Sequence, residues 1–150
     1  MQKSTWERLD ELFNKFPVMK AEPVSPSELR ALCDHQGWVF HPDYSAFVVS
    51  YGGALVGAYP IFGLRQAEAM GEPWSVIAAT MQFRGDGWAG TENWYIISMD
   101  GAGNPIGMLT DGSERVFSYD HDGGQIYEVA NSFENFIRAC LKIPRACGQI

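Results

Sequence analysis

Residues 93–141 decide the fold of this chain, and they run NWYIISMDGAGNPIGMLTDGSERVFSYDHDGGQIYEVANSFENFIRACL. The stretch holds about four short segments rich in Tyr, Ile, Val and Phe, the residue types that favour strands. The breaks DGAGN, TDGSE and DHDGG separate them and supply residues that tolerate positive φ in tight turns. Ser132 then opens a helix whose apolar stripe contains Phe133, Phe136, Ile137 and Leu141. The pattern predicts a compact sheet closed by a helix.

Two helices are predicted near the start of the chain. In the first, Ser4 is the expected N-cap and Glu7 completes a capping box, and Pro17 stops the helix. In the second, Ser25 is the expected N-cap, followed by Pro26 at the first helical position. The second helix should end at Gly37, with inward-facing Leu29, Leu32 and Cys33.

A third helix is predicted in the segment HPDYSAFVVSYGG, residues 41–53. Pro42 occupies a first-turn position and Asp43 complements the helix dipole. The Gly52–Gly53 pair should end this helix, and its buried stripe should contain Tyr44, Phe47, Val48 and Tyr51.

The middle of the chain gives weaker signals. Residues 57–64, GAYPIFGL, indicate a short strand or hairpin arm near an edge, because Pro60 cannot donate a backbone hydrogen bond. Residues 66–70 suggest one helical turn or more. Residues 74–84, WSVIAATMQFR, fit a buried helix or a strand, and we favour the helix. A loop, GDGWAGTEN, follows at residues 85–93.

Composition indicates one domain spanning residues 1–150, because 46% of the residues are hydrophobic and no linker or repeat interrupts them. The three cysteines, Cys33, Cys140 and Cys147, form no CxxC pair, and the charged N-terminus does not resemble a signal peptide. We therefore expect a reduced, cytoplasmic protein. No apolar run approaches the roughly 20 residues that a membrane span needs.

The formal net charge of −7 argues against nucleic acid as a direct ligand, since phosphate binding needs clustered Lys and Arg. A basic protein partner fits this charge better. The alternative is that the acidity serves only solubility, as it does in many cytosolic proteins.

The residues with the most obvious chemistry are Asp120, His121 and Asp122. A His between two carboxylates could be a general base or a metal ligand. The glycines that follow favour a turn instead, for which Asp is a common first residue. His35 and His41 have no ligand partner at helical spacing, and Cys33 has no basic neighbours that would activate it. We therefore expect no catalytic set, no metal and no cofactor.

Exposed aromatic side chains beside acids are typical of protein-binding surfaces. Trp88 and Trp94 lie in or beside a Gly-rich loop that also carries acids. The sequence therefore suggests six interface candidates: Asp86, Trp88, Glu92, Trp94, Asp120 and Asp122. The alternative is that Trp94 belongs to the core and that the carboxylates only stabilise turns.

In this order, the segments resemble the SUKH superfamily, which joins fungal cell-wall-assembly regulators of the Smi/Knr type to many bacterial immunity proteins. The resemblance rests on HPDYSAFVVSYGG, NWYIISMDGAGNPIG, RVFSYDHDGG and ANSFENFIRACL. It implies a single-domain α+β fold with a mainly antiparallel sheet flanked by helices, and no catalytic activity. For bacterial members it implies binding and neutralisation of a cognate polymorphic toxin, such as a nuclease or deaminase with a basic cleft. A regulatory scaffold module that binds a housekeeping protein is the alternative.

Overall fold

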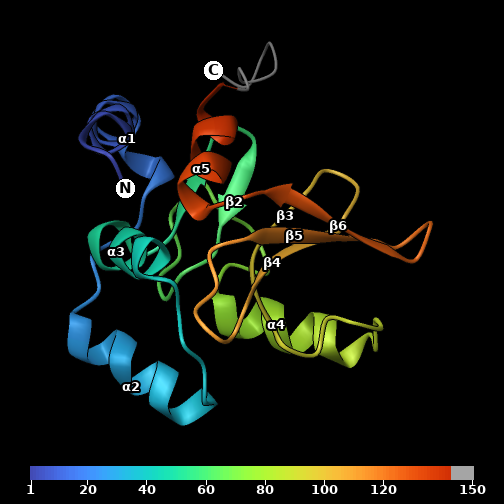
Figure 1. Ribbon diagram of the computed structural model, residues 1–150. Coiled ribbons are helices and arrows are strands. Elements are labelled where there is room, and N and C mark those ends of the chain that lie inside the picture. Colours follow the sequence, from blue (N-terminus) through green and yellow to red (C-terminus); the bar gives the residue numbers. More distant parts are fainter. Residues whose placement is uncertain (143–150) are drawn as a thin grey trace.

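The structure, a computed structural model, describes residues 1–142 and has an α+β fold (Figure 1). Helices precede and follow a short hairpin, and a four-stranded sheet occupies the C-terminal half (Figure 1). In chain order the elements are α1 (Lys3–Lys15), a 3-10 turn (Pro17–Met19), α2 (Pro26–Gln36), α3 (Pro42–Tyr51), β1 (Ala54–Val56), β2 (Tyr59–Ile61), α4 (Val76–Gly85), β3 (Trp94–Met99), β4 (Pro105–Leu109), β5 (Val116–Asp120), β6 (Gln125–Ala130) and α5 (Phe133–Lys142).

The main sheet is an antiparallel meander in the order β3-β4-β5-β6, and β1 and β2 form a separate hairpin. Short turns join its strands, as the Gly-containing breaks predicted. Helix α4 lies against one face of the sheet, while α5 lies on the opposite side (Figure 1). Both faces of β3 are therefore covered, and five of its six residues are buried. The predicted sheet closed by a terminal helix is confirmed.

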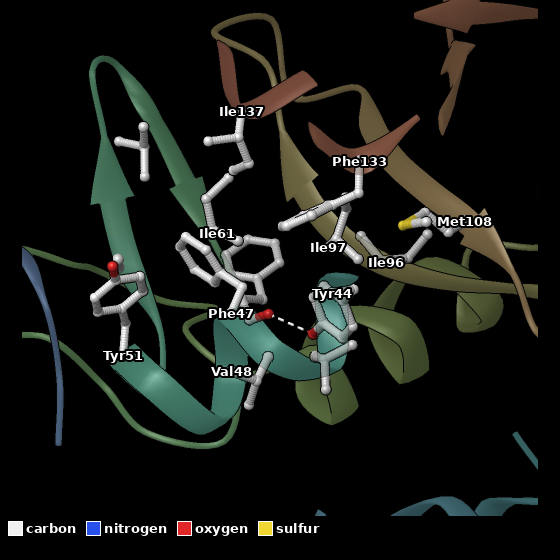
Figure 2. Close-up of a cluster of buried hydrophobic side chains, with 14 of the residues drawn as sticks. Tyr44, Phe47, Val48, Tyr51, Ile61, Ile96, Ile97, Met108, Phe133 and Ile137 are labelled. Atoms are coloured by element: carbon white, nitrogen blue, oxygen red, sulfur yellow. Dashed lines mark hydrogen bonds between the residues drawn. The ribbon is translucent and has the colours of Figure 1, made fainter. Parts of the chain in front are cut away.

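The centre of the core lies between α3, α5 and β3. Phe133 of α5 meets Tyr44 and Phe47 of α3 edge-on, with ring centroids 5.5 and 5.6 Å apart. Ile97 of β3 lies in the same cluster, and Figure 2 shows these side chains facing one another. The Tyr44 hydroxyl donates a 2.6 Å hydrogen bond to the backbone oxygen of Phe62, drawn as a dashed line in Figure 2. This bond satisfies a polar group that burial would otherwise destabilise.

Close backbone packing explains the glycine pair that ends α3. Gly52 has a φ of +75°, and a Cβ placed there would lie 2.0 Å from the backbone oxygen of Glu22. A Cβ on Gly53 would lie 2.4 Å from the backbone oxygen of Arg65. The oxygen of Gly52 also accepts hydrogen bonds from the backbone of residues 64 and 65. Only glycine lets these three segments approach so closely.

The predicted start of the first helix is wrong. Helix α1 begins at Lys3, so Ser4 lies inside it, and the side chain of the N-cap residue, Gln2, forms no capping hydrogen bond. Instead, the backbone N–H of Gln2 donates a 2.6 Å hydrogen bond to Oε2 of Glu134 on α5. The Thr5 hydroxyl donates to the same carboxylate oxygen at 2.8 Å. A residue far along the chain therefore replaces the expected capping box.

The other helix starts agree with the sequence. Ser25 accepts from the N–H of Glu28 at 3.1 Å, and Ser132 accepts from that of Asn135 at 3.1 Å. Most of the ambiguous segment 74–84 is helical, as favoured, because α4 begins at Val76. Ser75 caps this helix by accepting from the N–H of Ala78 at 3.0 Å. Local side-chain chemistry is sufficient to define these three ends.

Two smaller expectations need correction. Residues 66–70 form a turn rather than a helix, closed by a 3.0 Å hydrogen bond from the Met70 N–H to the Ala67 oxygen. On α5, Cys140 is fully buried while Leu141 is only half-buried, so the buried stripe ends one residue earlier than predicted.

Candidate functional site

A surface pocket of about 560 Å³ opens where the end of α4 meets two turns of the sheet. We call it the Trp88 pocket. The segment before α4, the last turn of α4 and its following loop, the β3–β4 turn and the β5–β6 turn all contribute to its walls. Its lining includes Glu72, Phe83, Asp86, Trp88, Met99 and His121.

The half-buried indole of Trp88 is held in place by other rings. It stacks on Tyr119, with centroids 5.1 Å apart and planes 16° apart, and it lies 5.0 Å from the ring of Phe83. The ring of His121 is also nearly parallel to it, at 6.2 Å. The Trp88 backbone oxygen accepts a 2.7 Å hydrogen bond from the Thr91 hydroxyl. The loop after α4 is thus packed onto the sheet through its aromatic residue.

A buried amide joins the two turns beside the pocket. Asn104 donates through Nδ2 to a carboxylate oxygen of Asp100 at 3.1 Å, which fixes the orientation of its amide group. Its Oδ1 then accepts from the backbone N–H of His121 at 3.0 Å and also contacts Nδ1 of the His121 ring. Because an amide oxygen only accepts, Nδ1 must carry the proton of this contact. The other ring nitrogen, Nε2, lies 3.4 Å from a carboxylate oxygen of Asp122.

A turn follows β5 at residues 121–124, as the sequence favoured, and Asp120 is the last strand residue before it. Oδ1 of Asp120 accepts a 3.0 Å hydrogen bond from the N–H of Asp122, and the Asp120 backbone oxygen accepts from Gly124 at 2.7 Å. Asp120 is half-buried and Asp122 is exposed. Both carboxylates are next to His121 in the chain, but the Asp120 carboxylate accepts a hydrogen bond that stabilises the turn.

The six candidate residues do not form one patch. Asp86 and Trp88 line the Trp88 pocket. Glu92 lies at a second hollow of about 320 Å³, shared with Trp88, and its carboxylate accepts from the Gly90 N–H at 3.2 Å. Trp94 is only 2% exposed and stacks on Phe117 at 6.0 Å, so it belongs to the core and offers no surface to a partner. Its position in β3, covered by α4, explains this burial.

Sequence reasoning missed several surface features. Glu72 and Met99 line the Trp88 pocket, although nothing in their local sequence relates them to Trp88. Strand β6 is exposed along nearly its whole length, and its large apolar side chains Ile126, Tyr127 and Val129 face solvent. In the sequence, Tyr127 and Val129 indicate only that a strand is present. Their alternating pattern does not show whether that strand lies at the edge or in the centre of the sheet.

A more apolar groove of about 430 Å³ lies between α2 and α3. Its lining includes Cys33, which was expected to be buried but is half-exposed. The partial burial raises the pKa of this thiol, with a smaller opposing effect from a backbone hydrogen bond to Phe40. Cys147 lies outside the described residues.

Within residues 1–142, no three His, Cys, Asp or Glu side chains gather closely enough to hold a metal ion. The two other histidines occupy helix ends, with His41 capping α3 through a 3.2 Å hydrogen bond from the Asp43 N–H and His35 in the last turn of α2. In the same part of the chain, no helix combines the length and the apolar character needed to cross a bilayer. The features that remain in residues 1–142 are surfaces, and the Trp88 pocket brings two acids together with several aromatic rings.

Comparison with known proteins gives one clear result. No curated protein matches the chain significantly. The model of the SMI1/KNR4 family, also called SUKH-1, matches residues 23–139, which run from the segment before α2 to the middle of α5. SUKH domains are generally non-catalytic immunity or regulatory proteins. Because the match covers most of the 150 residues, the chain belongs to the SMI1/KNR4 (SUKH-1) family.

Proposed function

We propose that this protein is a non-catalytic immunity protein of the cytoplasm, which binds a cognate polymorphic toxin and blocks it. Membership of the SMI1/KNR4 family over residues 23–139 is the observation that carries this proposal. The toxin would be a nuclease or deaminase domain with a basic active cleft. Blocking by direct contact requires no catalytic group in the immunity protein.

The charge of the chain supports a basic partner. With a net charge of −7, the protein attracts a positively charged domain and repels nucleic acid, the substrate that such a toxin would hold. Complementary charges speed association, while a few well-packed aromatic residues supply most of the affinity. Asp86, Trp88, Glu92 and Asp122 provide acids and an aromatic ring at or near the surface.

A tagged pull-down from the native cell tests this function. The protein is captured at low salt, washed at high salt, and the retained and released proteins are identified by mass spectrometry. We expect a basic toxin-like protein that salt releases, because surface charge pairs weaken as ionic strength rises. Expression of that toxin alone should then arrest growth, and co-expression of our protein should restore growth.

Two results would contradict the proposal. If only housekeeping proteins are retained, the regulatory scaffold function replaces the immunity function. If the recovered basic protein remains equally toxic when our protein is present in excess, binding does not amount to neutralisation.

A further inference from the structure

We propose that the Trp88 pocket receives a single arginine side chain from the protein partner. The inference rests on the proposed protein-binding function and names a contact at its interface. It commits to one residue type because the pocket combines three properties: a negative rim, an aromatic lining and a preformed shape.

The negative rim comes from two carboxylates. Glu72 precedes α4 and Asp86 follows it, so the two acids approach the pocket from opposite ends of the helix. Both residues are exposed, and within residues 1–142 neither carboxylate has a hydrogen-bond or ion-pair partner. Among the described residues, no Lys or Arg lines the pocket. A cation that enters the pocket would therefore find carboxylate acceptors that have no partner among the described residues.

The lining favours guanidinium over a simple ammonium group. Phe83, Trp88 and Met99 give the pocket apolar and aromatic walls, against which the stem and the flat head of an arginine can pack. Arginine presents several N–H donors in one plane and is more weakly hydrated than lysine, so entering a partly apolar pocket costs it less. The protein already contains such a pairing, since the guanidinium carbon of Arg84 lies 5.6 Å from the ring centre of Trp38.

The pocket is held open by contacts inside the protein. Tyr119 stacks on Trp88 from the sheet, and Asn104 fastens the β3–β4 turn to His121. These contacts fix the walls without any ligand, so binding has less conformational entropy to overcome. Its volume of about 560 Å³ lies within the range of pockets that bind small molecules.

A direct test uses N-acetyl-arginine amide as the probe and follows the indole N–H of Trp88 by NMR in the full-length protein. We expect a saturable shift with this compound. The matched citrulline compound, which has the same shape without the charge, should give no saturable shift. Equal responses to the two compounds, or no saturable response to arginine, would overturn the proposal.

Substitution of the two carboxylates tests whether they are responsible for arginine binding. Asp86→Asn and Glu72→Gln should each weaken arginine binding about tenfold, as expected for loss of a charge-assisted contact. Glu11→Gln makes the same charge change at an exposed position on α1, away from the pocket, and should leave binding unchanged. All three changes are on the surface, so circular dichroism should report the same fold. If Glu11→Gln weakens binding as much as the others, only the net charge matters and the pocket proposal fails.

The recovered partner separates this inference from the proposed function. A partner that binds the double variant Glu72→Gln, Asp86→Asn as tightly as the original protein refutes the arginine pocket and leaves the binding function intact. If the protein binds arginine saturably but neutralises no toxin, the arginine pocket is supported and the immunity function is refuted.

Discussion

Tyr44 places a hydroxyl group in the centre of an apolar core, where it needs a hydrogen-bond partner. Its side chain is fully buried, and its hydroxyl donates to the Phe62 oxygen at 2.6 Å. Burial raises the pKa of this phenol well above its usual value. The hydroxyl therefore remains a protonated donor at a pH at which an exposed phenol would ionise.

Tyr44→Phe should destabilise the protein by about 1–3 kcal/mol, because it leaves the Phe62 oxygen buried without this donor. Urea unfolding, followed by circular dichroism, measures the change. Tyr119→Phe is the matched control: its ring is half-buried, and within residues 1–142 its hydroxyl forms no hydrogen bond. Equal unfolding free energies for the two variants would show that the Tyr44 bond contributes nothing.

The two described cysteines should differ in reactivity. Cys140 is 1% exposed, and burial raises its pKa to about 12, so it has almost no thiolate near neutral pH. Cys33 is half-exposed. At about pH 8, iodoacetamide should modify Cys33 first and Cys140 only after unfolding in urea. Mass spectrometry of the two cysteine peptides follows this order, and simultaneous labelling would contradict the burial of Cys140.

At the scale of the elements, the end of α3 should be the position least tolerant of a side chain. Gly52 and Gly37 both end helices with positive φ, +75° and +72°, but only Gly52 is crowded by backbone. Gly37→Ala should cost about 1–2 kcal/mol, the strain of a left-handed alanine. Gly52→Ala adds a clash with the Glu22 oxygen and should cost several kcal/mol more or prevent folding. Thermal unfolding of the two variants measures the difference, and equal losses would contradict the clash.

Element ends could be predicted where the information lies within one helical turn. Ser25, Ser75 and Ser132 cap their helices through N–H groups three residues ahead, and that spacing is visible in the sequence. Ser4 has the same pattern but lies inside α1. Glu134 of α5 supplies the acceptor at that end instead, and its proximity depends on the packed fold. A capping pattern therefore predicts a helix more reliably than it predicts the first residue.

At the scale of the whole molecule, the sequence likewise predicts the local features of the candidate site but not the contacts that tertiary packing creates. The sequence correctly assigned Asp120 and Asp122 to a turn and placed Trp88 in a loop. It could not place Glu72 beside Trp88, because tertiary packing brings their segments together. It also could not separate Trp88 from Trp94, because the burial of Trp94 depends on its place in β3, where it stacks on Phe117 and where α4 lies against the strand.

The buried tyrosine hydroxyls and the buried cysteine thiol of the core should make the stability of the whole protein sensitive to alkali. Burial is the main cause that raises the pKa of Tyr44, Tyr51, Tyr95 and Cys140, so the folded state keeps these protons at a pH at which the unfolded chain releases them. Unfolded thiols and phenols titrate near about 8.5 and 10. Stability should therefore be complete below about pH 8 and should fall progressively above about pH 9.

The expected slope gives this prediction a measurable size. Each group that is protonated only in the folded state lowers the unfolding free energy by up to about 1.4 kcal/mol per pH unit. Urea unfolding at a series of alkaline pH values measures the curve. Tyr51→Phe removes one such group and its hydrogen bond to Asp10, so this variant should start less stable and lose stability less steeply. An unfolding free energy that stays constant up to about pH 11 would mean that these groups ionise as easily in the folded core as in water.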